Sequence, residues 1–269
     1  MNVVVIAGVG LIGGSFALAL RQAGFAGRII GVSSPATIEK ARARGVIDDA
    51  LPLHQAAGAA DLVYLAQPIE RILAMLPEVD AHVRPGALIT DAGSTKRAIV
   101  EHASKNIRRG RFIGGHPLAG KESRGVEEAD ANLFRGRPYV LTSREPELER
   151  WIGLIGARLV ILDPAEHDRL VALVSHLPQL ISTALAATIG EEPRAAEVAG
   201  PAATDLTRLA LSPHDIWRDI FATNSESIDA ALGAFIAKLE ALREQLRSPK
   251  MESAFAHAAQ AARELRRPR

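Results

Sequence analysis

The feature that most constrains this chain is a glycine-rich turn between an apolar strand and a helix, at its very start. Residues 3–7 (Val-Val-Val-Ile-Ala) form a short β-branched run, as expected of a strand that is buried on both faces. The segment 8–14 (Gly-Val-Gly-Leu-Ile-Gly-Gly) follows, and residues 15–20 have a helical pattern. Strand, glycine turn and helix in this order predict a nucleotide-binding α/β unit, whereas a glycine-rich turn of another α/β protein is the alternative.

The glycines of this turn have the spacing Gly-x-Gly-x-x-Gly, at positions 8, 10 and 13. In the dinucleotide fingerprint the first glycine permits a tight turn, the second lets backbone approach a pyrophosphate, and the third lets helix and strand pack closely. The following helix N-terminus offers unpaired N–H groups and a positive dipole end to the phosphates. The cofactor-binding residues predicted here are Gly8, Val9, Gly10, Leu11, Ile12 and Gly13.

A second strand is predicted at residues 28–32, and its end lacks the acidic residue that usually binds the ribose of NAD. Small hydroxyl residues stand there instead: Ser33, Ser34 and Thr37. They leave room and donors for a 2′-phosphate, and Lys40 or Arg42 could add a positive charge. The cofactor is therefore predicted to be NAD(P), with a slight preference for NADP; the alternative is that Ser33 binds either ribose loosely.

The remaining pattern divides the chain into two parts. Strands are predicted at residues 61–66, 87–91, 111–114, 137–142 and 158–162, with helices at 36–44, 69–79, 96–106 and 145–156. Helices alone are predicted afterwards, at residues 164–189 (kinked at Pro178), 194–209, 213–224, 225–246 and 250–265. We predict an α/β Rossmann-type dinucleotide-binding domain over residues 1–163, followed by an all-α domain over residues 164–269.

Composition narrows the function further. The chain has 269 residues, a formal net charge of +1 and no cysteine. A near-neutral charge gives no ground for nucleic-acid or anionic-membrane binding as its main activity. The lack of cysteine excludes disulfides, thiolate nucleophiles and cysteine-ligated metals, and no metal site is expected. No signal peptide and no apolar run of membrane-spanning length are predicted, so a cytoplasmic enzyme with no membrane partner is expected.

Polar residues at the predicted strand ends are the candidates for chemistry, because ligands in such sheets collect at the carboxyl ends of strands. Gln67 and Pro68 follow one strand, where the loop could lie along the cofactor, and Ser94 follows another. His116 stands between Gly115 and Pro117. Proline holds the residue before it in an extended conformation and glycine lets a substrate come close, so His116 is a candidate catalytic base. The alternative is a structural histidine that fills a hydrogen-bonding position in a turn.

Several stretches together resemble the prephenate/arogenate dehydrogenases of tyrosine biosynthesis. The resemblance covers essentially the whole chain in order. Besides the glycine turn, the stretches are residues 91–96 (Asp-Ala-Gly-Ser-Thr-Lys), 115–122 (Gly-His-Pro-Leu-Ala-Gly-Lys-Glu), 174–178 (Val-Ser-His-Leu-Pro), 205–208 (Asp-Leu-Thr-Arg) and 217–221 (Trp-Arg-Asp-Ile-Phe).

This resemblance implies an oxidative decarboxylation. Hydride would leave the carbon that carries the 4-hydroxyl of prephenate for NAD(P), the ring carboxylate would leave as carbon dioxide, and 4-hydroxyphenylpyruvate would form. His116 would accept the hydroxyl proton, as suits an imidazole near pH 7. Ser94 would orient His116 or bind the same hydroxyl, whereas the alternative for Ser94 is the N-cap of the following helix.

The resemblance also implies substrate-binding residues in the helical part, in a cleft between the domains. Arg208 would hold a substrate carboxylate, His176 would assist it, and Asp205 would position one or both. Glu122 and Lys121 would gate entry or balance charge beside His116. Without the resemblance, Arg208 is an ordinary helix arginine and His176 an ordinary buried histidine. The helical domain is expected to pair into a homodimer, and no fused regulatory domain is expected.

Other functions remain open at this point. The enzyme could act on arogenate, or on both substrates as a cyclohexadienyl dehydrogenase. A β-hydroxyacid dehydrogenase or an imine reductase also joins a Rossmann domain to a helical one, but those enzymes typically use a lysine where this chain offers His116. A catalytically silent nucleotide sensor is the alternative from another class.

Overall fold

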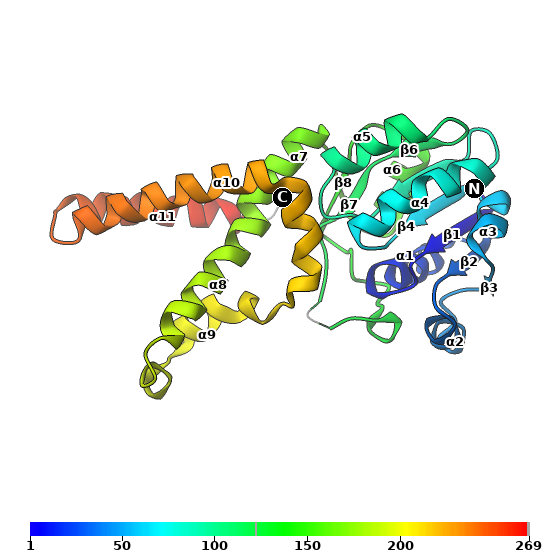
Figure 1. Cartoon of the computed structure of the whole chain (residues 1–269). Coiled ribbons are helices and arrows are strands. Elements are labelled where there is room, and N and C mark those ends of the chain that lie inside the picture. The colour runs from blue at the N-terminus through cyan, green and yellow to red at the C-terminus, as the bar shows by residue number, and fades with distance from the viewer. Residues whose placement is uncertain (122, 268–269) are drawn as a thin grey trace.

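The computed structural model describes residues 1–121 and 123–267, and a six-stranded sheet forms its N-terminal half (Figure 1). All neighbouring strands of this sheet are parallel, in the order β3-β2-β1-β4-β5-β6. Their bounds are β1 Val3–Ala7, β2 Arg28–Val32, β3 Asp49–Ala50, β4 Leu62–Leu65, β5 Leu88–Asp91 and β6 Arg111–Ile113. This is the doubly wound order of dinucleotide-binding folds, so the predicted Rossmann-type fold is confirmed.

Helices cover both faces of the sheet because its central strands are apolar on both sides. Val4 and Ile6 of β1 belong to one buried cluster, with Phe16 of α1, whereas Val5 and Ala7 belong to the other. The helices of this half are α1 Leu11–Gln22, α2 Pro35–Ala43, α3 Leu53–Ala59, α4 Ile69–His82 and α5 Arg97–Asn106. The two-residue strand β3 and the seven-residue helix α3 were not predicted, since elements this short show no periodicity.

A second, three-stranded sheet follows, in the order β7-β8-β9. Its elements are β7 Gly115–Pro117, β8 Pro138–Leu141, α6 Pro146–Leu154 and β9 Arg158–Ile161. Strand β7 runs antiparallel to β8, and β8 runs parallel to β9. The chain leaves the first sheet at Gly114, whose N–H donates to the Thr142 Oγ1 atom (3.0 Å) while its carbonyl accepts from the Thr142 N–H (2.9 Å). The strand that carries the candidate base was not predicted, and it belongs to this second sheet.

The described residues after Pro164 form only helices and turns. The helices are α7 Pro164–Val171, a π-helical segment Ala172–His176, α8 Leu177–Gly190, α9 Pro201–Thr207, α10 His214–Gln245 and α11 Lys250–Leu265. The helix expected to kink at Pro178 is interrupted one turn earlier, by the π segment. The predicted continuous helix at 194–209 is wrong: Gly200 and Pro201 start a new helix, because proline cannot donate the interior hydrogen bond.

Two further differences concern the long helices. The predicted helices at 213–224 and 225–246 are one helix, α10, with a non-helical residue at Asn224 (φ −136°, ψ 24°). The expectation that no apolar segment reaches membrane-spanning length is wrong: residues 164–190 are helical over 27 residues, and a stretch of 18 residues among them has a mean hydropathy of 1.6. This finding rests on length and composition alone, and a core helix of a soluble protein passes the same test.

The two halves meet through the second buried cluster, and the helical half then extends away from the sheet (Figure 1). Ala172, Leu177 and Ile220 join that cluster, together with α4 and α5 residues such as Ile72 and Ile99. Helices α10 and α11 form an antiparallel pair that projects far beyond the α/β half. Within the described part of the chain the strands all lie between Val3 and Ile161, and the predicted division at residue 163 into two domains stays a prediction.

Candidate active site

The glycine turn has the backbone geometry that its spacing predicts. Gly8 has φ +103°, and an added Cβ would lie 2.1 Å from the carbonyl oxygen of Ala66. A Cβ on Gly13 would lie 2.0 Å from the Gly8 carbonyl oxygen, so this glycine permits close packing of helix on turn. Gly10 is the N-cap of α1, has no side chain to cap the helix, and faces open space. The first amides of α1 therefore remain available to an anionic ligand.

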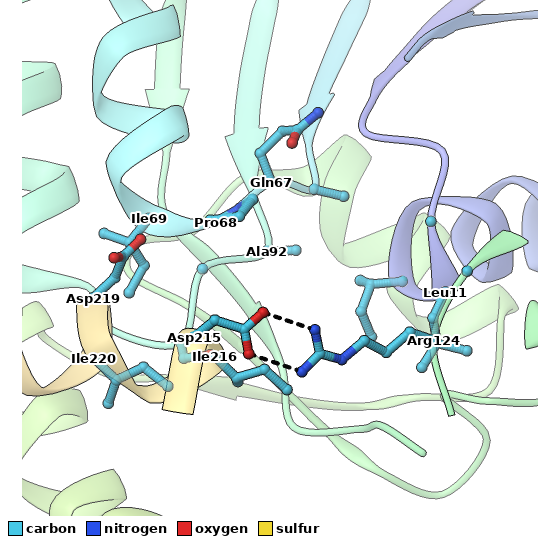
Figure 2. A pocket seen from close by; sticks show the side chains of 16 residues that line it. Leu11, Gln67, Pro68, Ile69, Ala92, Arg124, Asp215, Ile216, Asp219 and Ile220 are labelled. Carbon is cyan, nitrogen blue, oxygen red and sulfur yellow. Dashed lines mark hydrogen bonds and ion pairs between the residues drawn. The ribbon is translucent and has the colours of Figure 1, made fainter. Parts of the chain in front are cut away.

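A cavity of about 390 Å³ opens beside this turn, between the carboxyl ends of β4 and β5 and the start of α10 (Figure 2). It is lined by six of the predicted cofactor residues, namely Gly10, Leu11, Ile12, Gln67, Pro68 and Ser94. Val9 is fully buried below it, and Gly8 and Gly13 shape the turn. Arg124, Asp215 and Asp219 line the cavity too and were not predicted. Glycine backbone and a helix N-terminus beside a cavity of this size fit a dinucleotide.

The hydroxyl residues after β2 lie outside the walls of this cavity. Ser34 is the N-cap of α2: its Oγ accepts from the Thr37 N–H (3.4 Å) and lies 3.0 Å from the Thr37 Oγ1. Ser33 is half-buried at the end of the strand. Lys40, one of the two cations suggested for a 2′-phosphate, forms an ion pair with Glu127.

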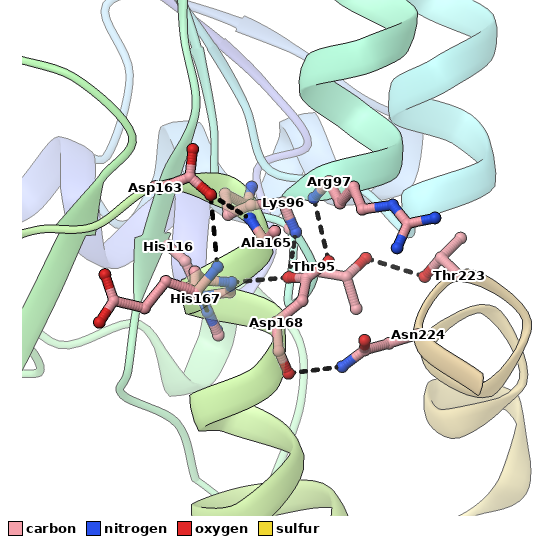
Figure 3. Close-up of polar contacts among 12 residues, drawn as sticks. Thr95, Lys96, Arg97, His116, Asp163, Ala165, His167, Asp168, Thr223 and Asn224 are labelled. Carbon is pink, nitrogen blue, oxygen red and sulfur yellow. Dashed lines mark hydrogen bonds and ion pairs between the residues drawn. The ribbon is translucent and has the colours of Figure 1, made fainter. Parts of the chain in front are cut away.

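His116 lies on β7 and heads a buried polar chain (Figure 3). Its Nδ1 lies 2.8 Å from the Nε2 of His167, and the Nδ1 of His167 lies 2.7 Å from the Oδ1 of Asp168. His167 is fully buried and Asp168 is 2% exposed. Burial holds the pKa of His116 well below its usual value, and the nearby His167, Lys96 and His176 lower it further. The His116 ring is therefore neutral near pH 7, as a proton acceptor requires.

Sequence reasoning missed His167 and Asp168. A signal was present, because His167 stands four residues before Val171 and so shares the buried face of α7. An imidazole on an apolar helix face is usually a core residue with one hydrogen bond, however, and nothing local indicates that its partner is His116, 51 residues away.

A buried ion pair fixes the backbone just before His116. The Lys96 ammonium pairs with Asp91 and donates to the carbonyl oxygen of Gly115 (2.7 Å). Asp91 in turn accepts from the Gly115 N–H (3.0 Å). Both side chains of the pair are fully buried, and burial lowers the pKa of Lys96 while Asp91 opposes this shift. Strand β7 is thereby tied to the end of β5.

Asp168 also caps helix α5 across the junction of the two halves. Its carboxylate accepts from the backbone N–H groups of Lys96 (2.7 Å) and Arg97 (3.0 Å). The alternative in which Ser94 is the N-cap of this helix is therefore wrong, since the cap position is Lys96 and the capping carboxylate comes from α7. Ser94 lies instead in the wall of the 390 Å³ cavity.

A second cavity of about 700 Å³ adjoins the first, and its walls carry three cations: Lys121, Arg124 and Arg208. Arg124 and Ile216 line both cavities. The Arg124 guanidinium makes two hydrogen bonds to the Asp215 carboxylate, of 3.0 and 3.1 Å, and so links the loop after β7 to the start of α10 (Figure 2). The Nζ atom of Lys121 forms an ion pair with the Oδ2 atom of Asp130, 3.3 Å away. Clustered cations suit a substrate with carboxylates.

The other predicted substrate residues are placed differently. His176 is 1% exposed, lies 3.3 Å from the Asn224 amide nitrogen, and packs edge-on against Trp217, which lines the second cavity. Burial lowers the pKa of His176 to about 4, with Asp168 opposing and His167 adding to the shift. His176 thus supports the cavity wall from behind.

Asp205 is exposed on α9 and lines neither cavity, although Arg208 lines the second. The chain changes from α-helix to a 3₁₀ turn at Arg208, which alters the angular spacing between the two side chains. The prediction for Glu122 lies outside the described residues. Within residues 1–121 and 123–267, no group of three or more potential metal ligands comes together.

Comparison with known families and proteins gives consistent results. The model for the prephenate dehydrogenase nucleotide-binding domain matches residues 16–168, and that for the prephenate dehydrogenase dimerization domain matches residues 163–260. The chain is 37% identical to a prephenate dehydrogenase of Lactococcus lactis over 233 residues, which are 84% of this chain and 66%, just under two thirds, of the relative.

Solved structures with the same fold span nearly the whole chain. Prephenate dehydrogenase from Aquifex aeolicus, in complex with hydroxyphenyl propionate and NAD+, superposes with a TM-score of 0.92 at 30% identity and covers 98% of each chain. Synechocystis arogenate dehydrogenase superposes with a TM-score of 0.85 at 31% identity, over 98% of this chain and 100% of that one.

Proposed function

The chain belongs to the prephenate dehydrogenase family of oxidoreductases, and on that premise we propose that it oxidises and decarboxylates prephenate to 4-hydroxyphenylpyruvate. The observation that carries the proposal is His116: a buried, neutral imidazole on a strand tied to β5. Ser94, after β5, lines the 390 Å³ cavity beside the glycine turn, and Lys121, after β7, lines the 700 Å³ cavity. A neutral imidazole suits the proton acceptor of an alcohol oxidation.

The cofactor is a nicotinamide dinucleotide, which accepts the hydride when bound. We propose that the pyrophosphate binds at the Gly10 turn and the first amides of α1, and that Gln67, Pro68 and Ser94 line the rest of its site. For the finer choice we propose NADP over NAD, because Ser33, Ser34 and Thr37 end β2 without an acidic residue. Since Lys40 is paired with Glu127, a 2′-phosphate would depend mainly on these hydroxyls.

In this proposal His116 moves one proton. The hydroxyl proton of the substrate passes to the Nε2 atom of His116, the ring nitrogen that is not engaged with His167. The C–O bond becomes a carbonyl as hydride leaves the same carbon. The bond to the ring carboxylate then breaks, and its electron pair makes the ring aromatic. Ser94, which lines the 390 Å³ cavity, would bind the same hydroxyl.

The two carboxylates of prephenate require cations. We propose that Arg208 binds one of them. Lys121 and Arg124, from the loop after β7, line the same cavity and balance charge there, each already paired with a carboxylate (Asp130 and Asp215). His176 acts by holding Trp217 and Asn224 in place. For Asp205 the proposal remains that it positions Arg208 or His176, and for Glu122 that it gates entry or balances charge beside the His116 segment of the sequence.

We propose that the enzyme is a cytoplasmic homodimer that pairs through the helical half. The matching family model describes a dimerization domain. Large apolar side chains are exposed along α10 and α11, namely Ile236, Leu239, Leu242, Leu246, Phe255 and Leu265. Covering these side chains against a second copy would remove them from water.

Steady-state kinetics with prephenate and arogenate, each with NAD and NADP, test the proposal. A higher kcat/KM with prephenate supports it, and a higher value with arogenate favours the rival activity of the Synechocystis neighbour. Comparable values for both would indicate a cyclohexadienyl dehydrogenase. If the folded chain binds a dinucleotide but turns over neither substrate, it is a nucleotide sensor instead.

A further inference from the structure

The polar chain behind His116 has a defined direction of hydrogen bonding. Asp168 is a carboxylate that already accepts two backbone N–H groups, so it can only accept from His167. The Nδ1 of His167 is therefore the protonated nitrogen, and in a neutral ring its Nε2 is an acceptor. The Nδ1 of His116, 2.8 Å away, must then carry a proton and donate it.

We propose that His167 and Asp168 are positioning residues that hold His116 in the tautomer with the proton on Nδ1 and the lone pair on Nε2. The proposal rests on the proposed function in one respect only: the lone pair at Nε2 matters because it accepts the substrate proton. Without a partner, a histidine ring has no fixed orientation and can carry its proton on either nitrogen. With the proton on Nε2, His116 could donate to a substrate hydroxyl but not accept from it.

The surroundings of these hydrogen-bonded side chains support a fixed orientation of the His116 ring. The His116 and His167 rings meet edge-on, with centroids 5.0 Å apart, and both are buried. Asp168 is held by the two α5 amides, and its own carbonyl oxygen accepts from the Asn224 side chain (2.8 Å; Figure 3). The cap of α5, the break in α10 and the candidate base therefore share one carboxylate residue.

Asp168 also provides the charge that this role needs. When Nε2 of His116 takes up a proton the ring becomes cationic, in a site where burial, His167, Lys96 and His176 all disfavour that charge. A hydrogen-bonded chain that ends in a carboxylate offsets part of this cost, as in other enzymes where a carboxylate orients a histidine base.

The first test is the ring ¹⁵N spectrum of the full chain labelled on histidine, without substrate, between pH 7 and 8. The expected result is a protonated, pyrrole-type Nδ1 and an unprotonated, pyridine-type Nε2 for His116, assigned by loss of the signals in His116→Asn. A protonated Nε2 on His116, or a doubly protonated His167 that donates to it, would overturn the proposal.

Kinetics of His167 variants form the second test. His167→Phe removes the acceptor while keeping an aromatic ring, and it should lower kcat about 10²-fold with KM nearly unchanged and shift the His116 proton towards Nε2. His167→Gln, whose amide has both a donor and an acceptor, should recover much of the rate. His102→Phe, a half-buried histidine on α5, is the matched control and should change neither.

The outcomes separate the two proposals. If His167→Phe keeps the wild-type kcat, the positioning role is wrong whatever the spectrum shows. If His167→Phe does not fold, the wild-type spectrum and the His167→Gln rate decide. If the spectrum is as expected but the wild-type chain turns over neither prephenate nor arogenate, the tautomer assignment stands and the proposed function fails.

Discussion

The α/β half and the helical half contribute to the site in different ways. In the α/β half the 390 Å³ cavity is framed by a glycine turn, a helix N-terminus and two strand ends. In the helical half the contributions are single side chains, such as Asp168, Arg208 and Asp215, that reach across to the first half or face a shared cavity. The comparison shows why one half is recognisable from local sequence and the other is not.

Polar contacts also join the halves near the site, beside the apolar contacts of the second buried cluster. The Glu70 N–H donates to Asp219 (3.1 Å), and the hydroxyls of Thr95 and Thr223 lie 2.8 Å apart. Each such contact pairs a residue at a strand end or helix start with a side chain from α10. The helical half is therefore expected to act on the site through hydrogen bonds and charge, and the following experiments test that division.

The largest expected effect falls on the base. His116→Asn should lower kcat about 10²–10⁴-fold, because it removes the proton acceptor, while the Kd of the cofactor stays at the wild-type value. Stopped-assay kinetics and cofactor titration measure the two quantities. His82→Asn, on the exposed end of α4, is the control. An unchanged kcat would remove His116 from the mechanism.

The next effect concerns the stability of the α/β half. Lys96→Met leaves Asp91 buried without its cation and should lower the free energy of unfolding by about 3–5 kcal/mol, measured by urea denaturation. Lys105→Met, an exposed lysine in the last turn of the same helix, should change it little. Equal losses in the two variants would show that the buried pair is not important for stability.

Acid should weaken the helical half through His176. Its pKa is about 4 in the folded chain and 6.5 in the unfolded one, so the folded state binds fewer protons and its stability falls as the pH decreases from 6.5 towards 4. The contribution is on the order of 3 kcal/mol, present above pH 6.5 and lost by about pH 4. Urea denaturation across this range should show that the free energy of unfolding depends less steeply on pH in His176→Phe than in the wild type. Identical slopes would contradict the lowered pKa of His176.

A smaller effect is expected on substrate binding. Arg208→Ala should raise the KM for prephenate about 10–10²-fold with kcat nearly unchanged, because a charge-assisted hydrogen bond contributes about 1.5–3 kcal/mol. Arg243→Ala, exposed near the end of α10, serves as the control. If KM holds and only the Tm decreases, Arg208 is a structural residue.

The smallest effect belongs to the exposed ion pair between the halves. Arg124→Ala and Asp215→Asn should each raise the KM of cofactor and substrate roughly two- to fivefold, and the double variant should show no further loss, since solvent screens such a pair. Arg144→Ala breaks a comparable pair remote from both cavities and is the reference. Additive losses in the double variant would mean that the two residues act separately.

Much of the fold follows from local patterns. The buried strands β1, β4 and β5 are largely apolar, and the fingerprint glycines have a fixed spacing between a strand and a helix, so both were predictable. The antiparallel strand β7 was not, because a three-residue strand (Gly115-His116-Pro117) has no periodicity and pairs with β8, more than twenty residues later. Asp168 was missed as the cap of α5 because a cap supplied from another helix has no sequence spacing.

The sequence by itself indicated that a cavity forms beside the glycine turn and which histidine is the candidate base, since a glycine turn and a glycine–histidine–proline segment restrict the backbone locally. The tertiary structure alone decided the partners: His167 and Asp168 behind His116, and Arg124 with Asp215 between the cavities. The physical reason is the distance along the sequence over which each feature is decided. A backbone conformation depends on its immediate neighbours, whereas a hydrogen bond between buried side chains depends on how distant helices pack.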